Sequence, residues 1–144
     1  IGDGPEMARI KAAAGPNVKV LGHQPFSVLK QHMQKAKAFV FAAEEDFGIT
    51  PVEAQACGTP VIAYGRGGAL ETVRGLGVSD RPTGAFFYQQ TPEAIAEAVK
   101  LFDTQASSKS AADCRANAEK FSIENFKQNL SELVERAIVA QRDN

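Results

Sequence analysis

Short apolar segments alternate along this chain with longer amphipathic segments, and this alternation decides the fold class. Strands separated by helices build βαβ units, in which the strands are parallel and the crossovers right-handed. We therefore predict an α/β domain with a Rossmann-like, doubly wound parallel sheet. The expected strands are "NVKVLG" (17–22), "AFVFA" (38–42), "PVIAY" (60–64) and "GAFFY" (84–88). In the first, Val18 and Val20 alternate with polar neighbours, whereas the second is almost continuously apolar, as expected for the buried centre of a parallel sheet.

Local end signals place the helices between these strands. Pro5 is expected at the first position of a helix, because proline lacks the N–H that this position leaves unbonded. Ser27, Thr50 and Thr91 are predicted to cap three later helices at their starts. Gly58 is the glycine expected just after the helix that begins at Thr50.

We expect the chain to be part of a longer protein. It has no initiator Met, and Ile1 looks like the last residue of a strand that begins upstream. Its 144 residues suit one compact domain. Residues 1–144 are therefore predicted to form a single domain that lacks its first strand and helix. Residues 110–142 show the apolar spacing of one or two further helices.

Composition excludes several classes of function. The net charge is −1, so no global basic field draws the chain to nucleic acid. The apolar runs are too short to span a bilayer. Cys57 and Cys114 are the only cysteines and lack a CxxC spacing. This pattern favours a reducing compartment, in which both are small buried or half-buried residues.

The segment "EEDFGITPVE" combines carboxylates with a helix start. It follows "AFVFA", and ligands of doubly wound sheets bind at the carboxyl ends of the strands. Gly48 permits a tight turn, and the N–H groups of Gly48, Ile49 and Thr50 are expected to form a phosphate site. Glu45 and Glu53 flank that site, where carboxylates could accept hydrogen bonds from sugar hydroxyls.

Glu53 also has a purely structural interpretation. Thr50, Pro51 and Glu53 match a capping box, in which the glutamate closes the start of the helix. Glu44 and Asp46 extend the acidic run and could suggest a divalent cation, but nothing in the sequence brings a further ligand to them. We therefore expect both to be solvated loop charges and predict no bound metal.

A second glycine-rich element, "GRGGALE", follows the next strand. Gly67 and Gly68 are expected to present bare N–H groups before a short helix, with Glu71 in its first turn. The alternative is an ordinary helix start with a favourable acidic residue. His23 and His32 are the only histidines, and neither lies in a nucleophile-and-base pattern. His23 follows the carboxyl end of a strand, so it could line the pocket or be an exposed loop residue.

Taken together, these elements resemble a known family. "EEDFGITPVEAQACGTPVIAYGRGGALETV" resembles the pattern E-G-F-G-x-x-x-x-E-A-x-A-x-G-x-P-V-I-A followed by G-G-x-x-E, and "GDGP", "VKVLGHQP" and "TGAFF" occur in matching order. This pattern is that of the family-4 retaining glycosyltransferases, which have the two-domain GT-B architecture. The similarity extends to about Phe102 and implies the carboxy-terminal, donor-binding half of such an enzyme. Asp46 and Gln55 depart from the pattern, where Gly and Met are usual.

The resemblance implies a role for each residue of the first motif. Glu45 would contact the transferred hexose and position it for front-face attack, which makes it the candidate catalytic residue. The backbone of Phe47 and Gly48 would line the hexose, and Ile49 and Thr50 would hold the diphosphate.

The remaining matches surround the nucleotide, with Glu53 at the ribose hydroxyls. They comprise the base-binding residues Gly22, His23 and Gln24, and a third motif near the donor, Gly67, Gly68 and Glu71. The family also places an Arg and a Lys before "IGDGP", where they neutralise the departing diphosphate.

The resemblance further implies a retaining hexosyltransferase. The motifs are most similar to bacterial mannosyltransferases that use GDP-mannose to build surface polysaccharides such as lipopolysaccharide. The expected donor is therefore GDP-mannose, and the expected acceptor is a polysaccharide or a lipid-linked glycan held by the missing amino-terminal domain. The enzyme would be cytoplasmic, with peripheral contact to the inner face of the membrane through that missing half. No cofactor or metal is expected, and this chain alone would be inactive.

Two other functions stay open on the sequence. One is a catalytically silent nucleotide-binding module that kept the fold. The other is a sugar-nucleotide epimerase or a phosphorylase of the same architecture.

Overall fold

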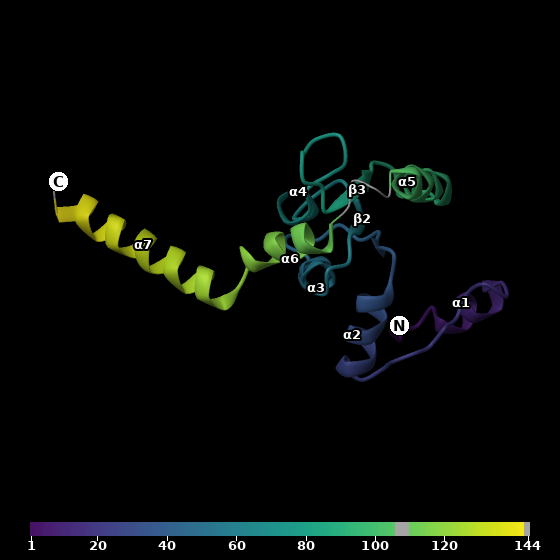
Figure 1. Ribbon diagram of the computed structural model, residues 1–144. Helices are drawn as coiled ribbons and strands as arrows, with labels where there is room; N and C mark the ends of the chain where they lie inside the picture. The colour runs from purple at the N-terminus through teal and green to yellow at the C-terminus, as the bar shows by residue number, and fades with distance from the viewer. Residues whose placement is uncertain (106–109, 143–144) are drawn as a thin grey trace.

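The computed structural model describes residues 1–105 and 110–142. Its centre is a parallel sheet in the order β1-β2-β3, formed by β1 (Phe39–Phe41), β2 (Val61–Tyr64) and β3 (Gly84–Phe87). Figure 1 labels β2 and β3. Phe39 pairs with Val61, and Val61 pairs with Gly84. Parallel neighbours joined through helical crossovers confirm the predicted α/β class.

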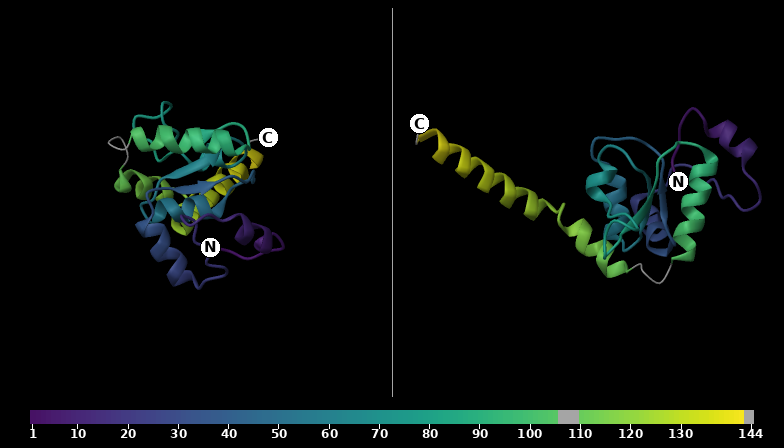
Figure 2. Two further views of the ribbon diagram at one scale, coloured as in Figure 1. Left: turned by 90° about the vertical axis from the view of Figure 1, so that its right-hand side faces the viewer. Right: turned by 90° about the horizontal axis from the view of Figure 1, so that it is seen from above.

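Helices cover both faces of this sheet. The described helices are α1 (Met7–Ala13), α2 (Phe26–Lys35), α3 (Ile49–Ala56), α4 (Ala69–Thr72), α5 (Pro92–Thr104), α6 (Ala111–Glu119) and α7 (Ile123–Arg142). Met33, Ala54 and Ala69 bring α2, α3 and α4 into one core cluster. Ala98 and Phe102 bring α5 into a second cluster on the opposite face, as Figure 2 shows.

Strand β2 is buried on both faces, which explains its continuous apolar run. Val61 and Ala63 belong to the cluster with α3, whereas Ile62 and Tyr64 belong to the cluster with α5. All four side chains are buried. This is the pattern expected of a central strand in a parallel sheet.

One strand prediction at the amino-terminal side is wrong, because residues 17–22 form no strand. That Ile1 ends a longer strand stays a prediction. Alternation of Val18 with polar neighbours favours a strand only where a sheet face covers it, and Val18 is 50% exposed. Strand β1 was expected among buried strands, but it lies at the edge of the described sheet, and Val40 is 45% exposed.

The predicted starts of the first two helices also differ from the structure. Helix α1 is capped by Glu6, so Pro5 lies before the helix instead of at its first position. Helix α2 begins at Phe26 with Pro25 as its N-cap, so Ser27 falls inside the first turn. The reason is local: Pro25, with φ −58° and ψ 152°, already has the extended conformation of a residue that precedes a helix.

Helix α3 is entered through a glycine. Gly48 is its N-cap, with a left-handed φ of +81°, and no side chain caps the helix. The predicted capping box between Thr50 and Glu53 is therefore wrong, because the turn at Gly48 starts the helix before Thr50. The predicted Gly58 beyond the helix end (φ +83°) and the Thr91 cap of α5 are both confirmed.

A buried polar network ties α3, α4 and α6 together. The Gln55 side-chain Nε2 donates to the Thr72 carbonyl at 2.8 Å, and Asn117 Nδ2 donates to the same carbonyl at 2.8 Å. Asn117 Nδ2 also donates to Gln55 Oε1 at 2.8 Å. The departure of Gln55 from the usual Met thus has a structural reason. Helix α6, which lies beyond the motifs that carried the resemblance, completes this network.

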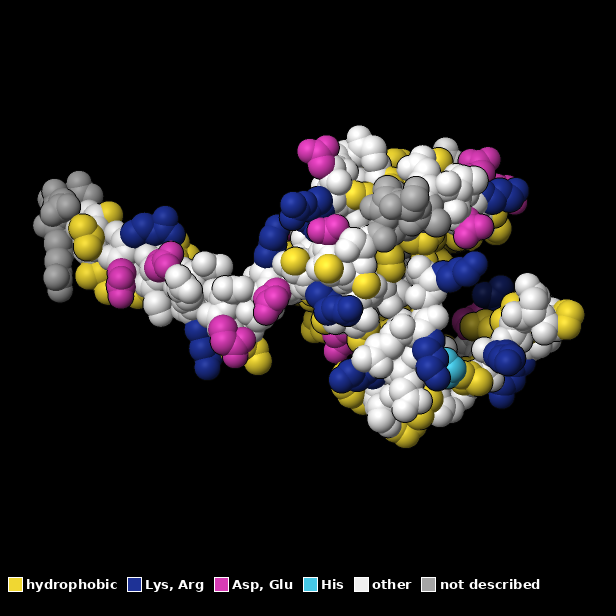
Figure 3. Space-filling view, in the orientation of Figure 1, with side chains coloured by type: hydrophobic (Ala, Val, Ile, Leu, Met, Phe, Trp, Pro, Cys, Tyr) yellow, Lys and Arg dark blue, Asp and Glu magenta, His cyan; other side chains and the backbone are white. Residues whose placement is uncertain are grey.

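Helix α7 extends away from the sheet (Figures 1 and 2) and keeps its apolar stripe exposed. Figure 3 shows hydrophobic side chains along it. Ile123 and Phe126 are 67% and 63% exposed. The helical spacing predicted over this segment is confirmed. None of the described helices is both long and apolar enough to cross a membrane.

The network gives a stability prediction. Asn117→Ala removes the donor to Gln55 Oε1, which then stays buried without a partner. Such a loss typically costs about 1–3 kcal/mol, so the free energy of unfolding measured by urea titration should fall by that amount. The matched control is Asn129→Ala on exposed α7, which should change it by less than about 0.5 kcal/mol. Equal stability of the two variants would contradict the role given to the network.

Candidate functional site

Three loops meet at the carboxyl edge of the sheet. They follow β1, β2 and β3 and span residues 42–48, 65–68 and 88–91. The Gln90 side chain donates from Nε2 to the Ala42 carbonyl at 2.7 Å, which joins the first loop to the third across β2. The edge where the ligands of doubly wound sheets bind is therefore a connected surface.

The first and second loops are joined backbone to backbone. The N–H of Gly68 donates to the carbonyl oxygen of Glu45 at 2.8 Å. A Cβ added at Gly68 would lie 2.4 Å from the Asp46 oxygen, and one at Gly67 (φ +56°) would lie 2.5 Å from the Glu45 oxygen. Both glycines are required for this approach. The predicted motifs, distant in sequence, are brought together.

This contact corrects one expectation. Gly67 and Gly68 were predicted to present bare N–H groups, but the Gly68 N–H is occupied by the Glu45 carbonyl. Helix α4 has only four residues, too short for an anion site at its start. Glu71 lies in this helix and is exposed. The second motif thus holds the first loop in place, and its exposed charged side chains are those of Arg66 and Glu71.

The start of α3 keeps its amides available. In the described part of the chain, no hydrogen bond uses the backbone N–H of Gly48, Ile49 or Thr50. Gly48 is buried, and the eight-residue helix that follows directs its partial positive charge toward this turn. The geometry is compatible with the predicted diphosphate site.

The two predicted sugar-binding carboxylates lie in different surroundings. Glu45 is exposed in the loop after β1. Glu53 is half-buried and lines a hollow of about 420 Å³ between α2 and α3, together with Phe26, Lys30 and Arg115 among others. Placement of both acids on one ligand stays a prediction.

The predicted base-binding residues lie in a separate turn. Gly22 has a left-handed φ of +66°, and its carbonyl accepts from the N–H of Gly2 at 2.9 Å. Gln24 Nε2 donates to the Leu21 carbonyl at 2.7 Å, and His23 is exposed. These two bonds hold the turn together and join it to Gly2, just before α1. Figure 1 shows α1 apart from the sheet. Phe26, just beyond Gln24, is the residue that reaches the hollow containing Glu53.

Two residues at this edge, Tyr88 and Arg66, were not singled out from the sequence, whereas the backbone of Phe47 was predicted to line the hexose. The ring of Tyr88 lies against Gly65, where an added Cβ would be 2.6 Å from the Tyr88 Cε1 atom, and Tyr88 is 65% exposed. Phe47 packs edge-on against Phe121, with ring centroids 5.5 Å apart. Arg66 stands between the glycines of the second motif. Only Arg66 carried a signal, as a cation inside a glycine-rich loop.

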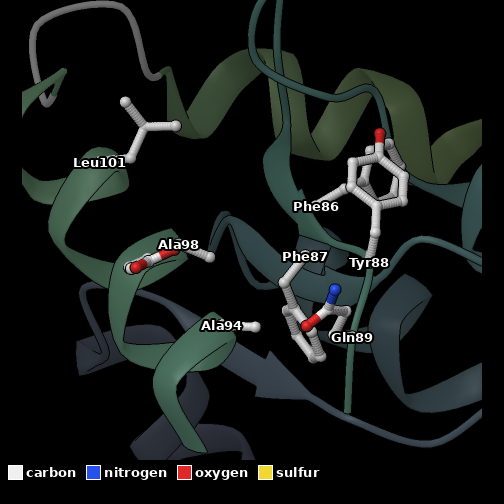
Figure 4. Close-up of a pocket in the computed structure, with 8 residues that line it drawn as sticks. Phe86, Phe87, Tyr88, Gln89, Ala94, Ala98 and Leu101 are labelled. Carbon is white, nitrogen blue, oxygen red and sulfur yellow. The ribbon is translucent and has the colours of Figure 1, made fainter. Parts of the chain in front are cut away.

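A further hollow of about 440 Å³ lies between β3 and α5 (Figure 4). Ala94, Ala98 and Leu101 line it from α5, and Phe87 and Gln89 line it from β3 and the loop that follows. Its lining contains none of the predicted site residues. Tyr88 and Gln89, which belong to the third loop, also line it, so the hollow adjoins the carboxyl edge.

Neither cysteine has the character of a nucleophile. Burial raises the pKa of the Cys114 thiol to about 11, so it stays protonated at neutral pH. Its Sγ lies 3.9 Å from the Thr83 carbonyl. Cys57 is half-buried, and both thiols are free, as predicted. Within the described residues, no three or more His, Cys, Asp or Glu side chains cluster to hold a metal. The expectation of chemistry without a metal stays a prediction.

Comparison with known proteins identifies the family. Residues 1–121 match the family described as Glycosyl transferases group 1. The chain belongs to this family. The match includes all three loops of the carboxyl edge. It also includes α6, which is hydrogen-bonded to α4 through Asn117 and the Thr72 carbonyl.

Curated members of the glycosyltransferase group 1 family are similar to this chain. It is 34% identical over 98 residues to the D-inositol 3-phosphate glycosyltransferase of Jonesia denitrificans. The aligned region covers 67% of this chain and 22% of the relative. Human alpha-1,3/1,6-mannosyltransferase ALG2 is 33% identical over 100 residues, 67% of this chain and 23% of the relative. A GDP-mannose-dependent monoacylated alpha-(1-6)-phosphatidylinositol monomannoside mannosyltransferase of Corynebacterium glutamicum is 37% identical over 75 residues, 46% and 20% of the two chains.

Solved structures share the fold. Sucrose-phosphate synthase of Thermosynechococcus elongatus superposes with a TM-score of 0.69 at 24% identity, over 92% of this chain and 33% of that one. Anabaena Alr3699/HepE, in complex with UDP and glucose, has a TM-score of 0.64 at 26% identity, over 90% and 34% of the two chains. The chain thus spans about a fifth of its curated relatives and about a third of these solved chains.

The joined loops give a prediction for Gly68. Gly68→Ala places a methyl group 2.4 Å from the Asp46 oxygen and the Phe47 Cα atom, so one loop must move. Overpacking of this kind typically costs about 1–3 kcal/mol, and thermal unfolding should show the loss. Gly4→Ala is the control, because an added Cβ there meets nothing within 4 Å. A Gly68→Ala variant as stable as Gly4→Ala would show that the loops do not need this contact.

Proposed function

We propose that this chain is the donor-binding half of a family-4 retaining glycosyltransferase of GT-B architecture, which transfers a hexose from a nucleotide sugar. The observation that carries the proposal is the bond from the Gly68 N–H to the Glu45 carbonyl. This bond joins the second motif to the acidic loop that leads into α3. The loop, the second motif and the unbonded N–H groups at the start of α3 therefore form one surface. Such a surface offers acceptors for sugar hydroxyls next to donors for a phosphate.

Each group of this surface has a distinct task in the proposed reaction. The N–H groups of Ile49 and Thr50 hold the diphosphate and stabilise the charge that develops on it as it leaves. The Glu45 carboxylate accepts hydrogen bonds from the hexose, beside the backbone of Phe47 and Gly48. It positions the sugar for attack on the face from which the diphosphate departs.

The nucleoside is proposed to lie further along α3. Glu53 accepts hydrogen bonds from the ribose hydroxyls. The base reaches Gly22, His23 and Gln24 once that turn closes toward Phe26, which already lines the hollow with Glu53.

Mannose from GDP-mannose is the proposed donor. Two relatives are mannosyltransferases, and one of them is GDP-mannose-dependent by name. HepE, by contrast, is solved in complex with UDP and glucose, so the donors to be compared include both guanosine and uridine diphosphate sugars. The proposed acceptor is a polysaccharide or a lipid-linked glycan, held by an amino-terminal domain of the full-length enzyme.

We further propose that the whole enzyme works in the cytoplasm at the inner face of the membrane, consistent with two free thiols. This chain alone is proposed to be inactive, because the acceptor side of the cleft is missing from it. A silent nucleotide-binding module, an epimerase or a phosphorylase on the same fold are the competing functions. Product analysis separates them: no turnover, an epimerised nucleotide sugar, or dependence on free phosphate would each displace the transferase.

The direct test uses the full-length protein. Titration with GDP-mannose, UDP-glucose and UDP-N-acetylglucosamine should give saturable binding to GDP-mannose in preference to the others. Glu45→Ala should lower the rate of sugar transfer roughly 100-fold, because the hexose loses its positioning contact. The neighbouring Glu44→Ala, in the same exposed loop, is the matched control and should keep the rate. Binding to none of the three donors would refute the proposal.

Glu53 gives a more selective prediction, because the structure excludes its role as a cap. In the full-length protein, Glu53→Gln should weaken GDP binding roughly ten-fold through the lost charged acceptor. The affinity for 2′,3′-dideoxy-GDP should be the same as in the wild type. The melting temperature should stay constant, as it should for the exposed control Glu124→Gln. Equal losses for both nucleotides would place Glu53 away from the ribose.

A further inference from the structure

The carboxyl edge carries a marked imbalance of charge. Residues 42–50, 65–71 and 88–91, which form its three loops and the helix starts beside them, contain four carboxylates: Glu44, Glu45, Asp46 and Glu71. The same residues contain a single Lys or Arg, which is Arg66. An anion that approaches this edge meets repulsion from every charged side chain except one.

Arg66 is held by its backbone but not by any carboxylate. Its loop is fixed on both sides, because the Gly65 N–H donates to the Phe87 carbonyl at 2.8 Å and the Gly68 N–H donates to the Glu45 carbonyl at 2.8 Å. Across residues 1–105 and 110–142, none of the ion pairs includes Arg66, although four acids lie in the adjoining loops. The charge is thus available to a ligand.

The guanidinium is also pre-positioned. Its Cζ atom lies 5.9 Å from the centre of the Tyr64 ring, a cation–π arrangement. Tyr64 is itself fixed in the core, where its ring centroid lies 5.9 Å from that of Phe87. A stacked guanidinium loses less freedom on binding than a mobile side chain and keeps its edge donors free. This favours a planar, bidentate partner such as a phosphate.

We propose that Arg66 binds a phosphate group of the nucleoside diphosphate donor and offsets the acidic character of this edge. The inference rests on the proposed function, since it assumes that the donor lies across the three loops. The helix start at Gly48 offers only partial charges to a group that carries full negative charges. Arg66 supplies the full positive charge on this chain that the helix start lacks. It is distinct from the basic pair that the resemblance places upstream of Ile1.

The test compares nucleotides that differ only in their phosphates. Binding of GDP and guanosine, and of UDP and uridine, is measured with the full-length wild type and with Arg66→Gln, in the absence of acceptor. Arg66→Gln should weaken binding of the diphosphate roughly ten-fold, as expected for a lost hydrogen bond to a charged group. Nucleoside binding should not change. Arg66→Lys keeps the positive charge but not the planar guanidinium. Its affinity for the diphosphate should lie between those of the wild type and Arg66→Gln.

Arg81→Gln is the matched control. Arg81 is an exposed arginine in the loop before β3, at the opposite edge of the sheet, and its loss should leave all four affinities unchanged. The melting temperature of Arg81→Gln should equal that of the wild type, because its side chain is exposed. That of Arg66→Gln should fall only slightly, because the side chain is exposed and, within the described residues, loses no interaction other than the cation–π contact with Tyr64.

The outcomes separate the two levels of the proposal. If the wild type binds neither diphosphate, the proposed function fails, and the role of Arg66 fails with it. If the wild type binds a diphosphate and Arg66→Gln binds it equally well, only the inference on Arg66 is overturned. It is likewise overturned if the variant loses diphosphate and nucleoside binding in equal proportion.

Discussion

The hydrogen bond from the Gly68 N–H to the Glu45 carbonyl is the contact on which the arrangement of the carboxyl edge depends. It joins loops that follow neighbouring strands, and it forms only because neither Gly67 nor Gly68 has a Cβ to keep the chains apart. The acidic loop after β1 is thereby fixed against the second motif. The two glycines allow the backbones of the two loops to approach each other closely. This close approach, and not a pair of free N–H groups, is their contribution to the site.

The support beneath this contact comes from elements that are remote in sequence. Thr72 Oγ1 donates to the Gly68 carbonyl at 2.9 Å, and the Thr72 carbonyl accepts from Gln55 and Asn117. The last turn of α3, the second motif and α6 are therefore connected by one chain of buried hydrogen bonds. A buried network that loses one partner destabilises the fold. A substitution in α6 should therefore also disturb the loops that this network supports.

The electrostatic character of the edge follows from the same packing. The loops bring acidic side chains together with unoccupied amides at Gly48 and a single unpaired cation, Arg66. Acids suit sugar hydroxyls, whereas amides and a guanidinium suit phosphates. A nucleotide sugar contains both kinds of group, which is why the proposed donor fits this chain of the glycosyltransferase group 1 family better than a ligand of one kind.

The sequence by itself determined the α/β class, β2 and β3, most helices and the two motifs, because these depend on local apolar periodicity and on glycine and proline signals. Tertiary structure decided what local signals do not contain. Residues 17–22 alternate like a strand, yet no sheet face covers Val18. Thr50 and Glu53 match a capping box, yet the left-handed turn at Gly48 starts the helix earlier. The contact between Glu45 and Gly68, the partner of Gln55 and the isolation of Arg66 from the nearby acids all depend on residues far apart in the chain, which pattern alone cannot place.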